Sequence, residues 1–178
     1  ERWRFPPPDP RTNIKLGTWF ERWPVAVDPT GQKVAVAAPG RIWELDLRTG
    51  RATMVTRVKD CTAMSYGHDS ADGAPFLVLA RTTGDVRLFR PTGLERARID
   101  GEPVFVQLRD GVLTAATAEG SLQRLRAYDE AEPPVEGLCC EGVTDAAVDG
   151  ERAVLTCAAT CGAAAAVVDT AQGTSVLA

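Results

Sequence analysis

Residues 25–50 read VAVDPTGQKVAVAAPGRIWELDLRTG, and this stretch contains the pattern that decides the fold. In it, short runs of valine, alanine, isoleucine and leucine alternate with turn-forming residues, namely Asp28-Pro29-Thr30-Gly31, Pro39-Gly40 and Arg48-Thr49-Gly50. Apolar runs of this length, bounded by Gly, Pro, Asp and Thr, are typical of β-strands joined by tight turns. The stretch therefore predicts strands over Val25–Asp28, Lys33–Ala38 and Arg41–Asp46, followed by a strand over Arg51–Arg57.

The turn glycines recur along the rest of the chain at intervals of about 40 residues. Glycine suits these corners because a tight hairpin turn requires a positive φ, which glycine adopts at little cost. The glycines form three series: Gly31, Gly73, Gly111 and Gly150; Gly40, Gly84, Gly120 and Gly162; and Gly50, Gly93 and Gly173. A period of ~40–45 residues with four strands per unit is the signature of a propeller blade. The repeat thus predicts an all-β fold, a β-propeller of about four four-stranded blades.

The other predicted strands follow the same order within each unit. The second unit has strands over Thr62–Tyr66, Pro75–Arg81, Asp85–Arg90 and Leu94–Ile99. The third has strands over Pro103–Leu108, Val112–Ala116 and Ser121–Arg126, with a weak edge strand near Pro134–Leu138. The fourth has strands over Val143–Val148, Arg152–Ala158, Ala163–Asp169 and Thr174–Leu177. The blades are therefore expected at residues 24–57, 61–99, 103–138 and 143–178, after an extended arm at residues 1–23.

The first unit resembles a WD40 repeat, whose third strand ends in Trp-Asp before a Thr-Gly turn. In Ile42 to Gly50, Leu45-Asp46 stands where Trp-Asp would be, and Thr49-Gly50 follows. Phe89-Arg90 and Val168-Asp169 fill the same position in later units, so the resemblance extends over residues 24–178. No unit has a true Trp-Asp pair, and the family's Gly-His pair is absent from its usual place. The resemblance implies a WD40-like propeller, and we do not transfer the family's His–Asp hydrogen-bond relay to this chain.

The proposed arm is rich in proline and in large aromatic residues. The run Pro6-Pro7-Pro8 excludes a helix and disfavours a central strand, because proline has no N–H to donate. Large aromatic side chains rarely remain in water, so we expect the arm to dock on its own domain or on a partner. The candidate contacts are Trp3, Phe5, Trp19 and Phe20.

Arginines cluster in the second unit, where Arg81, Arg87, Arg90, Arg96 and Arg98 lie close together in the sequence. Side chains two residues apart on a strand share a face, so Arg96 and Arg98 should form a row. Guanidinium groups in such a row can hold a carboxylate-rich partner or a phosphate. The alternative is an ordinary exposed outer strand.

The remaining polar residues do not predict a catalytic or metal-binding set. The five cysteines (Cys61, Cys139, Cys140, Cys157 and Cys161) are an odd number, so at least one is free or bonded outside this chain. They are read as small buried hydrophobic residues, with a disulfide and a zinc site as alternatives. His68, Asp69, Ser70 and Asp72, like the acidic stretch Asp129 to Glu132, are read as solvated turn and loop residues.

Composition narrows the class of protein. The chain has 178 residues, with 20 basic and 24 acidic side chains and a net charge of −4, which disfavours nucleic-acid binding. No apolar run reaches the ~18–20 residues that a membrane span requires. We therefore predict a non-catalytic protein-interaction scaffold, without cofactor or metal, that is a subunit of a larger assembly. Its four units would form a small closed ring, a piece of a larger ring or an open stack covered by partners, and a piece of something larger is favoured. The alternatives are a propeller enzyme or ligand- or metal-binding protein with a central-channel site, and a substrate-recognition subunit of a ubiquitin ligase. Localisation stays open between the cytoplasm and an organelle.

Overall fold

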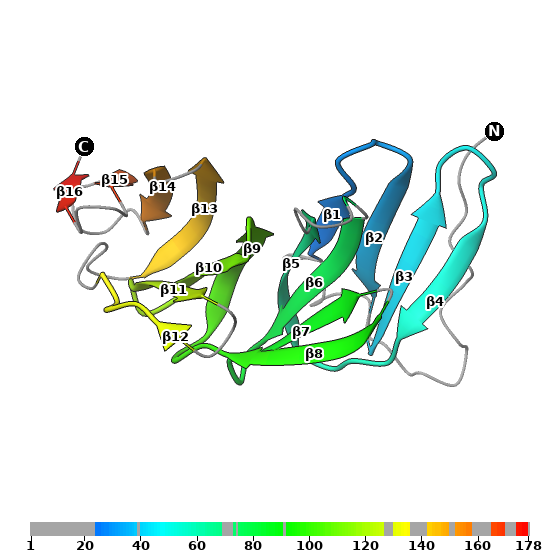
Figure 1. Ribbon diagram of the computed structural model, residues 1–178, viewed down its shortest axis with the longest axis horizontal. Coiled ribbons are helices and arrows are strands. Elements are labelled where there is room, and N and C mark those ends of the chain that lie inside the picture. Colours follow the sequence, from blue (N-terminus) through cyan, green and yellow to red (C-terminus); the bar gives the residue numbers. More distant parts are fainter. Residues whose placement is uncertain are drawn as a thin grey trace, which may run out of the picture. The chain divides into compact units, whose positions relative to one another are not determined.

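The computed structural model describes residues 24–38, 40–68, 73, 75–90, 92–126, 130–135, 142–149, 152–157, 165–169 and 174–177. The proposed arm at residues 1–23 lies outside the described residues. Within the described part, all regular elements are strands, labelled β1 to β16 (Figure 1). The chain divides into two compact units, Glu1–Lys59 and Asp60–Ala178, and each is described by itself below.

The first unit contains a four-stranded antiparallel sheet in the order β1-β2-β3-β4. Its strands are β1 (Val25–Val27), β2 (Lys33–Ala38), β3 (Arg41–Asp46) and β4 (Ala52–Thr56). Consecutive strands pair with each other because each connecting turn is short, as the turn residues predicted.

The second unit begins with two groups of four antiparallel strands. The first group is β5 (Cys61–His68), β6 (Pro75–Arg81), β7 (Asp85–Arg90) and β8 (Gly93–Arg98). The second group is β9 (Pro103–Arg109), β10 (Val112–Thr117), β11 (Leu122–Arg126) and β12 (Glu130–Ala131). A single parallel bridge between His68 and Arg109 joins β5 to β9, so the sheet order is β12-β11-β10-β9-β5-β6-β7-β8.

A separate four-stranded antiparallel sheet completes the second unit, in the order β13-β14-β15-β16. Its strands are β13 (Val143–Asp149), β14 (Arg152–Cys157), β15 (Ala165–Asp169) and β16 (Thr174–Leu177). The all-β fold with curled four-stranded groups is that of a β-propeller.

One predicted strand is wrong. The edge strand of the third unit was expected near Pro134–Leu138, but the chain pairs with β11 earlier, at Glu130–Ala131, and afterwards makes only the bridge Leu122–Val135. The physical reason lies in two features. Glu132 forms ion pairs with arginines on β11, and the two prolines that follow it have no N–H to continue the ladder.

The glycine corners occur where the repeat predicted them. Every described member of the three series has a positive φ and lies in or beside a turn between consecutive antiparallel strands: Gly31, Gly40, Gly50, Gly73, Gly84, Gly93, Gly111 and Gly120. Gly150, Gly162 and Gly173 lie outside the described residues.

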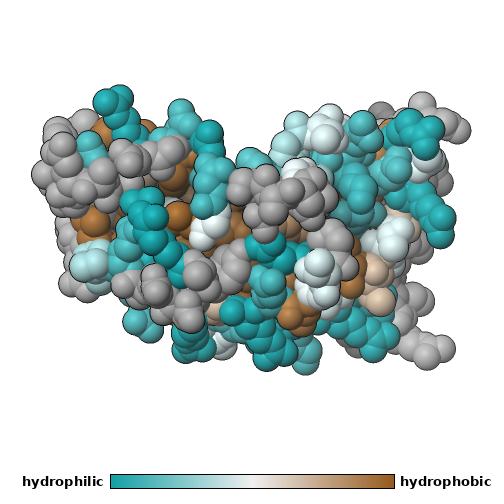
Figure 2. Space-filling model, in the orientation of Figure 1, coloured by the Kyte–Doolittle hydropathy of each residue, from teal (hydrophilic) through white to brown (hydrophobic). Residues whose placement is uncertain are grey.

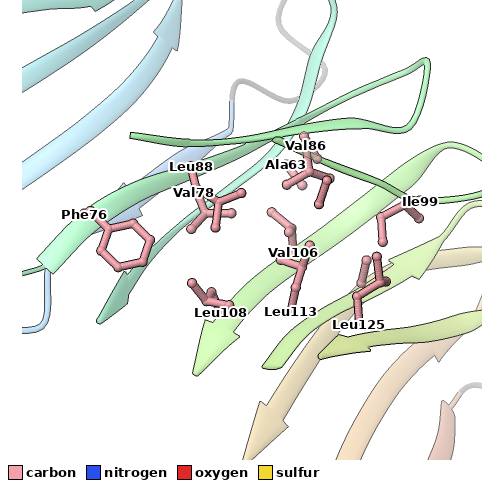
Figure 3. Close-up of a cluster of buried hydrophobic side chains, with 13 residues drawn as sticks. Ala63, Phe76, Val78, Val86, Leu88, Ile99, Val106, Leu108, Leu113 and Leu125 are labelled. Atoms are coloured by element: carbon pink, nitrogen blue, oxygen red, sulfur yellow. The ribbon is translucent and has the colours of Figure 1, made fainter. Parts of the chain in front are cut away.

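The core of the second unit consists of apolar layers between neighbouring four-stranded groups. In the first layer, side chains of β5–β8 point toward those of β9–β11, as Figure 3 shows for Val78, Leu88, Val106 and Leu113. A second layer joins the β9–β12 group to the β13–β16 sheet and consists of Ala116, Leu122, Val143, Ala153, Leu155, Ala166 and Val168. Small alanines let neighbouring sheets approach closely, while leucine and valine fill the remaining volume.

Candidate functional site

The sheet of the first unit has one face made of apolar side chains, which we call the open apolar face. The strand registers place them in two rows across the sheet, Val25–Val36–Trp43–Met54 and Val27–Val34–Leu45–Ala52. Val36 and Leu45, on the two central strands, are buried, whereas three large members on the outer strands remain exposed to solvent: Val25 at 54% and Val27 at 58% on β1, and Met54 at 41% on β4. Exposed large apolar side chains on one sheet face are typical of an interaction surface.

The opposite face of the same sheet is also apolar near its centre, where its side chains are buried. Ala35 and Ile42 are fully buried, and Ala26 and Ala37 nearly so. The sheet therefore has two apolar sides, of which one keeps large side chains in water. In Figure 2, teal hydrophilic residues make up the larger part of the coloured surface, and hydrophobic residues show as patches between them.

A second surface lies on the β5–β8 group, and we call it the arginine face. It consists of Arg81, Arg87, Arg96 and Arg98, which surround Asp85 on one side of strands β6 to β8. The register pairs Asp85 with Arg98 and Arg87 with Arg96 across β7 and β8. Arg87 also pairs with the fully buried Leu79 on β6, and Arg81 follows two residues later on the same side.

Asp85 is shared by two of these arginines. Its carboxylate lies 3.0 Å from Nε of Arg87 and 3.4 Å from a terminal nitrogen of Arg81. Arg96 and Arg98 are exposed, and among the described residues no ion pair joins either of them to a carboxylate. The predicted row of Arg96 and Arg98 is therefore present, and the structure extends it to Arg81 and Arg87.

Arg90 does not belong to this row, which corrects its grouping with the other arginines in the sequence. It lies on the opposite face, with its guanidinium 4.5 Å from the centre of the Phe76 ring. Its Nε is 2.9 Å from a carboxylate oxygen of Glu95, and its side chain is only 14% exposed. The reason is the twofold alternation of strands, which places Arg90 on the other side from Arg87.

The described cysteines are in two different states. Cys61 is a free thiol, and burial raises the pKa of Cys61 to about 12, although the thiol also interacts with the carbonyl of Ala63. Such a thiol is protonated and unreactive at neutral pH. Cys157 is disulfide-bonded. The interpretation of the cysteines as small buried hydrophobic residues is therefore replaced at Cys157 by its alternative, a disulfide, and Cys139, Cys140 and Cys161 lie outside the described residues.

Two aspartates in the first unit hold turns. Asp28 is buried, and burial opposes its ionisation, but hydrogen bonds from the hydroxyl of Thr30 (2.5 Å) and the backbone N–H of Lys33 (2.8 Å) lower its pKa overall. Asp46, at the end of β3, accepts a 2.7 Å hydrogen bond from the backbone N–H of Thr49, which lowers its pKa. Both carboxylates thus stabilise their own hairpin turns.

The other candidates for chemistry do not converge. His68 ends β5 and forms the bridge to β9, whereas Asp69, Ser70 and Asp72 lie outside the described residues. In the acidic stretch, Glu132 accepts from Arg126 at 2.6 Å and lies 3.3 Å from Arg124. Within the described part of the chain, no group of three or more His, Cys, Asp or Glu side chains could hold a metal ion.

Of the predicted partner contacts, Arg96 and Arg98 lie on the arginine face, whereas Trp3, Phe5, Trp19 and Phe20 lie outside the described residues. Sequence reasoning did not single out the open apolar face. Its signal was present in the strict alternation of β2, where Val34 and Val36 point to one side and Ala35 and Ala37 to the other. Alternation of two apolar residue types predicts a strand with two buried faces, and it does not tell which face stays open.

Comparisons with known proteins identify the fold but no family. No protein-family model matches the chain. No curated protein matches it either. No helix among the described residues is long and apolar enough to cross a membrane. A propeller-like chain in the crystal structure of the mitotic checkpoint complex matches with a TM-score of 0.70 and 13% sequence identity. The match covers 85% of this chain and 47% of that chain, so the present chain spans about half of the neighbour's length. At this identity the likeness concerns the fold alone, and the fold that the two chains share is that of a β-propeller.

Proposed function

We propose that this protein is a non-catalytic, WD40-like platform that binds other proteins as a subunit of a larger assembly. The observation that carries the proposal is the open apolar face of the β1–β4 sheet. Val25, Val27 and Met54 on this face would be covered by a protein partner.

The apolar area that these side chains expose would contribute to the free energy of binding. Covering a large apolar side chain stabilises a complex by about 1.5–3 kcal/mol at full burial. A sheet that is apolar on both sides is most stable as a middle layer, with another sheet on each side. The partner that fits best therefore presents an apolar sheet face of its own.

The comparison with solved structures supports the same proposal. The propeller-like neighbour comes from the mitotic checkpoint complex, so that chain is part of a protein assembly.

The test is to isolate the tagged chain from its source at native abundance and to measure the mass of the particle that contains it. We expect an assembly heavier than the 19.0 kDa chain. The double substitution Val27→Lys and Met54→Lys should release the partner, because a lysine ammonium has no compensating contact in an apolar interface, and association should weaken by roughly 100-fold or more.

Thr53→Lys is the matched control, because Thr53 is exposed on the same strand but points to the opposite side. The control variant should keep the assembly. A chain that runs as a monomer at native abundance, or an assembly that survives the double substitution, would contradict the proposal. Stoichiometric metal in the purified protein would favour a metal-binding propeller instead.

A further inference from the structure

The charges on the arginine face are not balanced within the sheet. Across β7 and β8, Arg87 stands directly opposite Arg96, and like charges in this arrangement destabilise a sheet. Along the described strands β6 to β8, this face carries four guanidinium groups and one carboxylate, that of Asp85. Local conflicts of this kind are expected where a surface serves a function besides folding.

The exposed end of this face is its outer strand. Arg96 and Arg98 are exposed on β8, while the side chains of Arg81 and Arg87 are only 25% and 20% exposed and are held by Asp85. Leu94, on the same side of β8, is 49% exposed. A ligand that approaches β8 therefore meets two guanidinium groups and one apolar side chain.

Arg90, on the opposite face of the same strands, is an arginine that stabilises the fold. It is paired with Glu95 and packed on the ring of Phe76, and its charge is neutralised within the sheet. Arg96 and Arg98 have no such role among the described residues, so their charges remain available to a ligand.

The spacing of the two arginines limits the shape of the ligand. Residues two apart on a strand lie about 7 Å apart along it, which equals the distance between alternate residues of an extended peptide. Only two guanidinium groups are exposed on β8, which is fewer than the row of phosphate contacts that nucleic-acid binding depends on, and two guanidinium groups at this spacing match two carboxylates of an extended peptide.

From this geometry we propose that the arginine face binds an extended acidic segment of a protein partner, with carboxylates at alternate positions that pair with Arg96 and Arg98. The inference rests on the proposed function, since it assigns to that function a second contact and the chemistry of its ligand. Arg81 and Arg87 contribute positive potential behind the contact, and Leu94 offers an apolar contact beside it.

The test measures fluorescence anisotropy of a labelled peptide of alternating glutamate and serine, titrated with the full chain. We expect binding that weakens as salt is added, because the contact is between exposed charges. Arg96→Gln combined with Arg98→Gln should weaken binding by roughly 2–30-fold, since each exposed ion pair contributes about 1.4–5-fold. Arg152→Gln, an exposed arginine on β14, is the matched control and should leave binding unchanged.

Three comparison probes test which ligand the arginine face prefers. A peptide with the same composition but all glutamates in one block should bind more weakly, and the glutamine version should not bind. Equal binding of the blocked and alternating peptides, equal loss in the Arg152→Gln variant, or tighter binding of single-stranded DNA of matched charge would overturn the inference.

The inference and the proposed function fail in different ways. If the native assembly forms but the acidic peptide does not bind, the arginine face is not a docking site and the platform function stands. If the peptide binds but the chain never joins an assembly, the site stands and the platform function fails.

Discussion

Gly84 occupies the turn between β6 and β7 with a φ of +78°, and a Cβ atom added there would lie 2.0 Å from the carbonyl oxygen of Ile99. The backbone is held at this place because the N–H of Ile99 donates to the carbonyl of Gly84 at 2.9 Å. Gly111 has a similar φ of +76°, but a Cβ there would meet nothing within 4 Å. Substitutions at the two glycines therefore distinguish the cost of backbone strain, which both positions share, from the cost of steric overlap, which only Gly84 has.

We expect Gly84→Ala to destabilise the second unit by roughly 2–5 kcal/mol, as left-handed strain and a backbone clash add. Gly111→Ala should cost only about 1–2 kcal/mol, because strain alone remains. Urea unfolding followed by far-UV circular dichroism measures both. Equal losses for the two variants would show that the contact with Ile99 relaxes freely.

Ionisation of Asp28 makes the stability of the turn between β1 and β2 depend on pH. Its folded-state pKa lies below the unfolded value of 3.8, because the hydrogen bonds from Thr30 and Lys33 outweigh burial. The ionised carboxylate therefore stabilises the fold above that pH, and this contribution is lost as the pH falls through the folded-state pKa. Acid should thus weaken the first unit.

Asp28→Asn should flatten the fall in stability below about pH 4, because the group that titrates has been removed. Thr30→Ala should give an intermediate curve, since one of the hydrogen bonds to the carboxylate is lost. Tryptophan fluorescence is a suitable readout, because Trp43 lies on β3 of the first unit and the sequence has no tryptophan after it. Superimposable pH curves for the wild type and Asp28→Asn would contradict this role.

At the scale of elements, the contact between β5 and β9 depends on a missing side chain. A Cβ atom on Gly67 would lie 3.0 Å from Cβ of Leu108 and 3.3 Å from a methyl group of Val78. Gly67→Val should therefore separate the two strands and destabilise the unit by about 1–3 kcal/mol.

Ser65→Ala is the control on the same face of β5. Because the buried Ser65 hydroxyl has no hydrogen-bond partner among the described residues, its removal should be neutral or slightly stabilising. Thermal unfolding by circular dichroism distinguishes the two.

The pair Arg87–Arg96 gives a prediction for strands β7 and β8 as a unit. Arg96→Glu replaces a cross-strand repulsion with an attraction and should stabilise the sheet by about 0.2–1 kcal/mol. The same substitution should abolish binding of the acidic peptide. Denaturation and peptide titration of one variant thus report opposite effects. A loss of stability together with unchanged peptide binding would show that the arginines serve the fold.

At the scale of the molecule, stability comes from the layers between sheets rather than from any sheet alone. Leu155 on β14 is fully buried in the layer with β10 and β11, whereas its neighbour Val154 is 46% exposed on the other side. Leu155→Ala should cost about 2–5 kcal/mol, because it removes buried surface and leaves a cavity. Val154→Ala should cost less than about 1 kcal/mol, since most of the side chain is already in water. Equal costs in urea unfolding would mean that the β13–β16 sheet does not depend on its neighbour.

The sequence predicted the strands and the turns between them, which are the local features of the fold. The apolar runs and the turn glycines predicted the strands from Val25 to Leu177 closely, because short antiparallel hairpins are specified by residues that are near one another in the sequence. The prediction was wrong for β12, where pairing with β11 and the ion pairs of Glu132 outweighed the apolar run that follows.

The sequence by itself determined the repeat, the all-β class and the row of Arg96 and Arg98, since each depends on turn chemistry or on the twofold alternation of a strand. Only the tertiary structure decided that Arg90 is neutralised by Glu95, that Arg87 faces Arg96, and that Val25 and Val27 remain in water. These facts depend on strand register and on which sheet covers which face. Register and coverage join residues far apart in the chain, and a local pattern does not encode them.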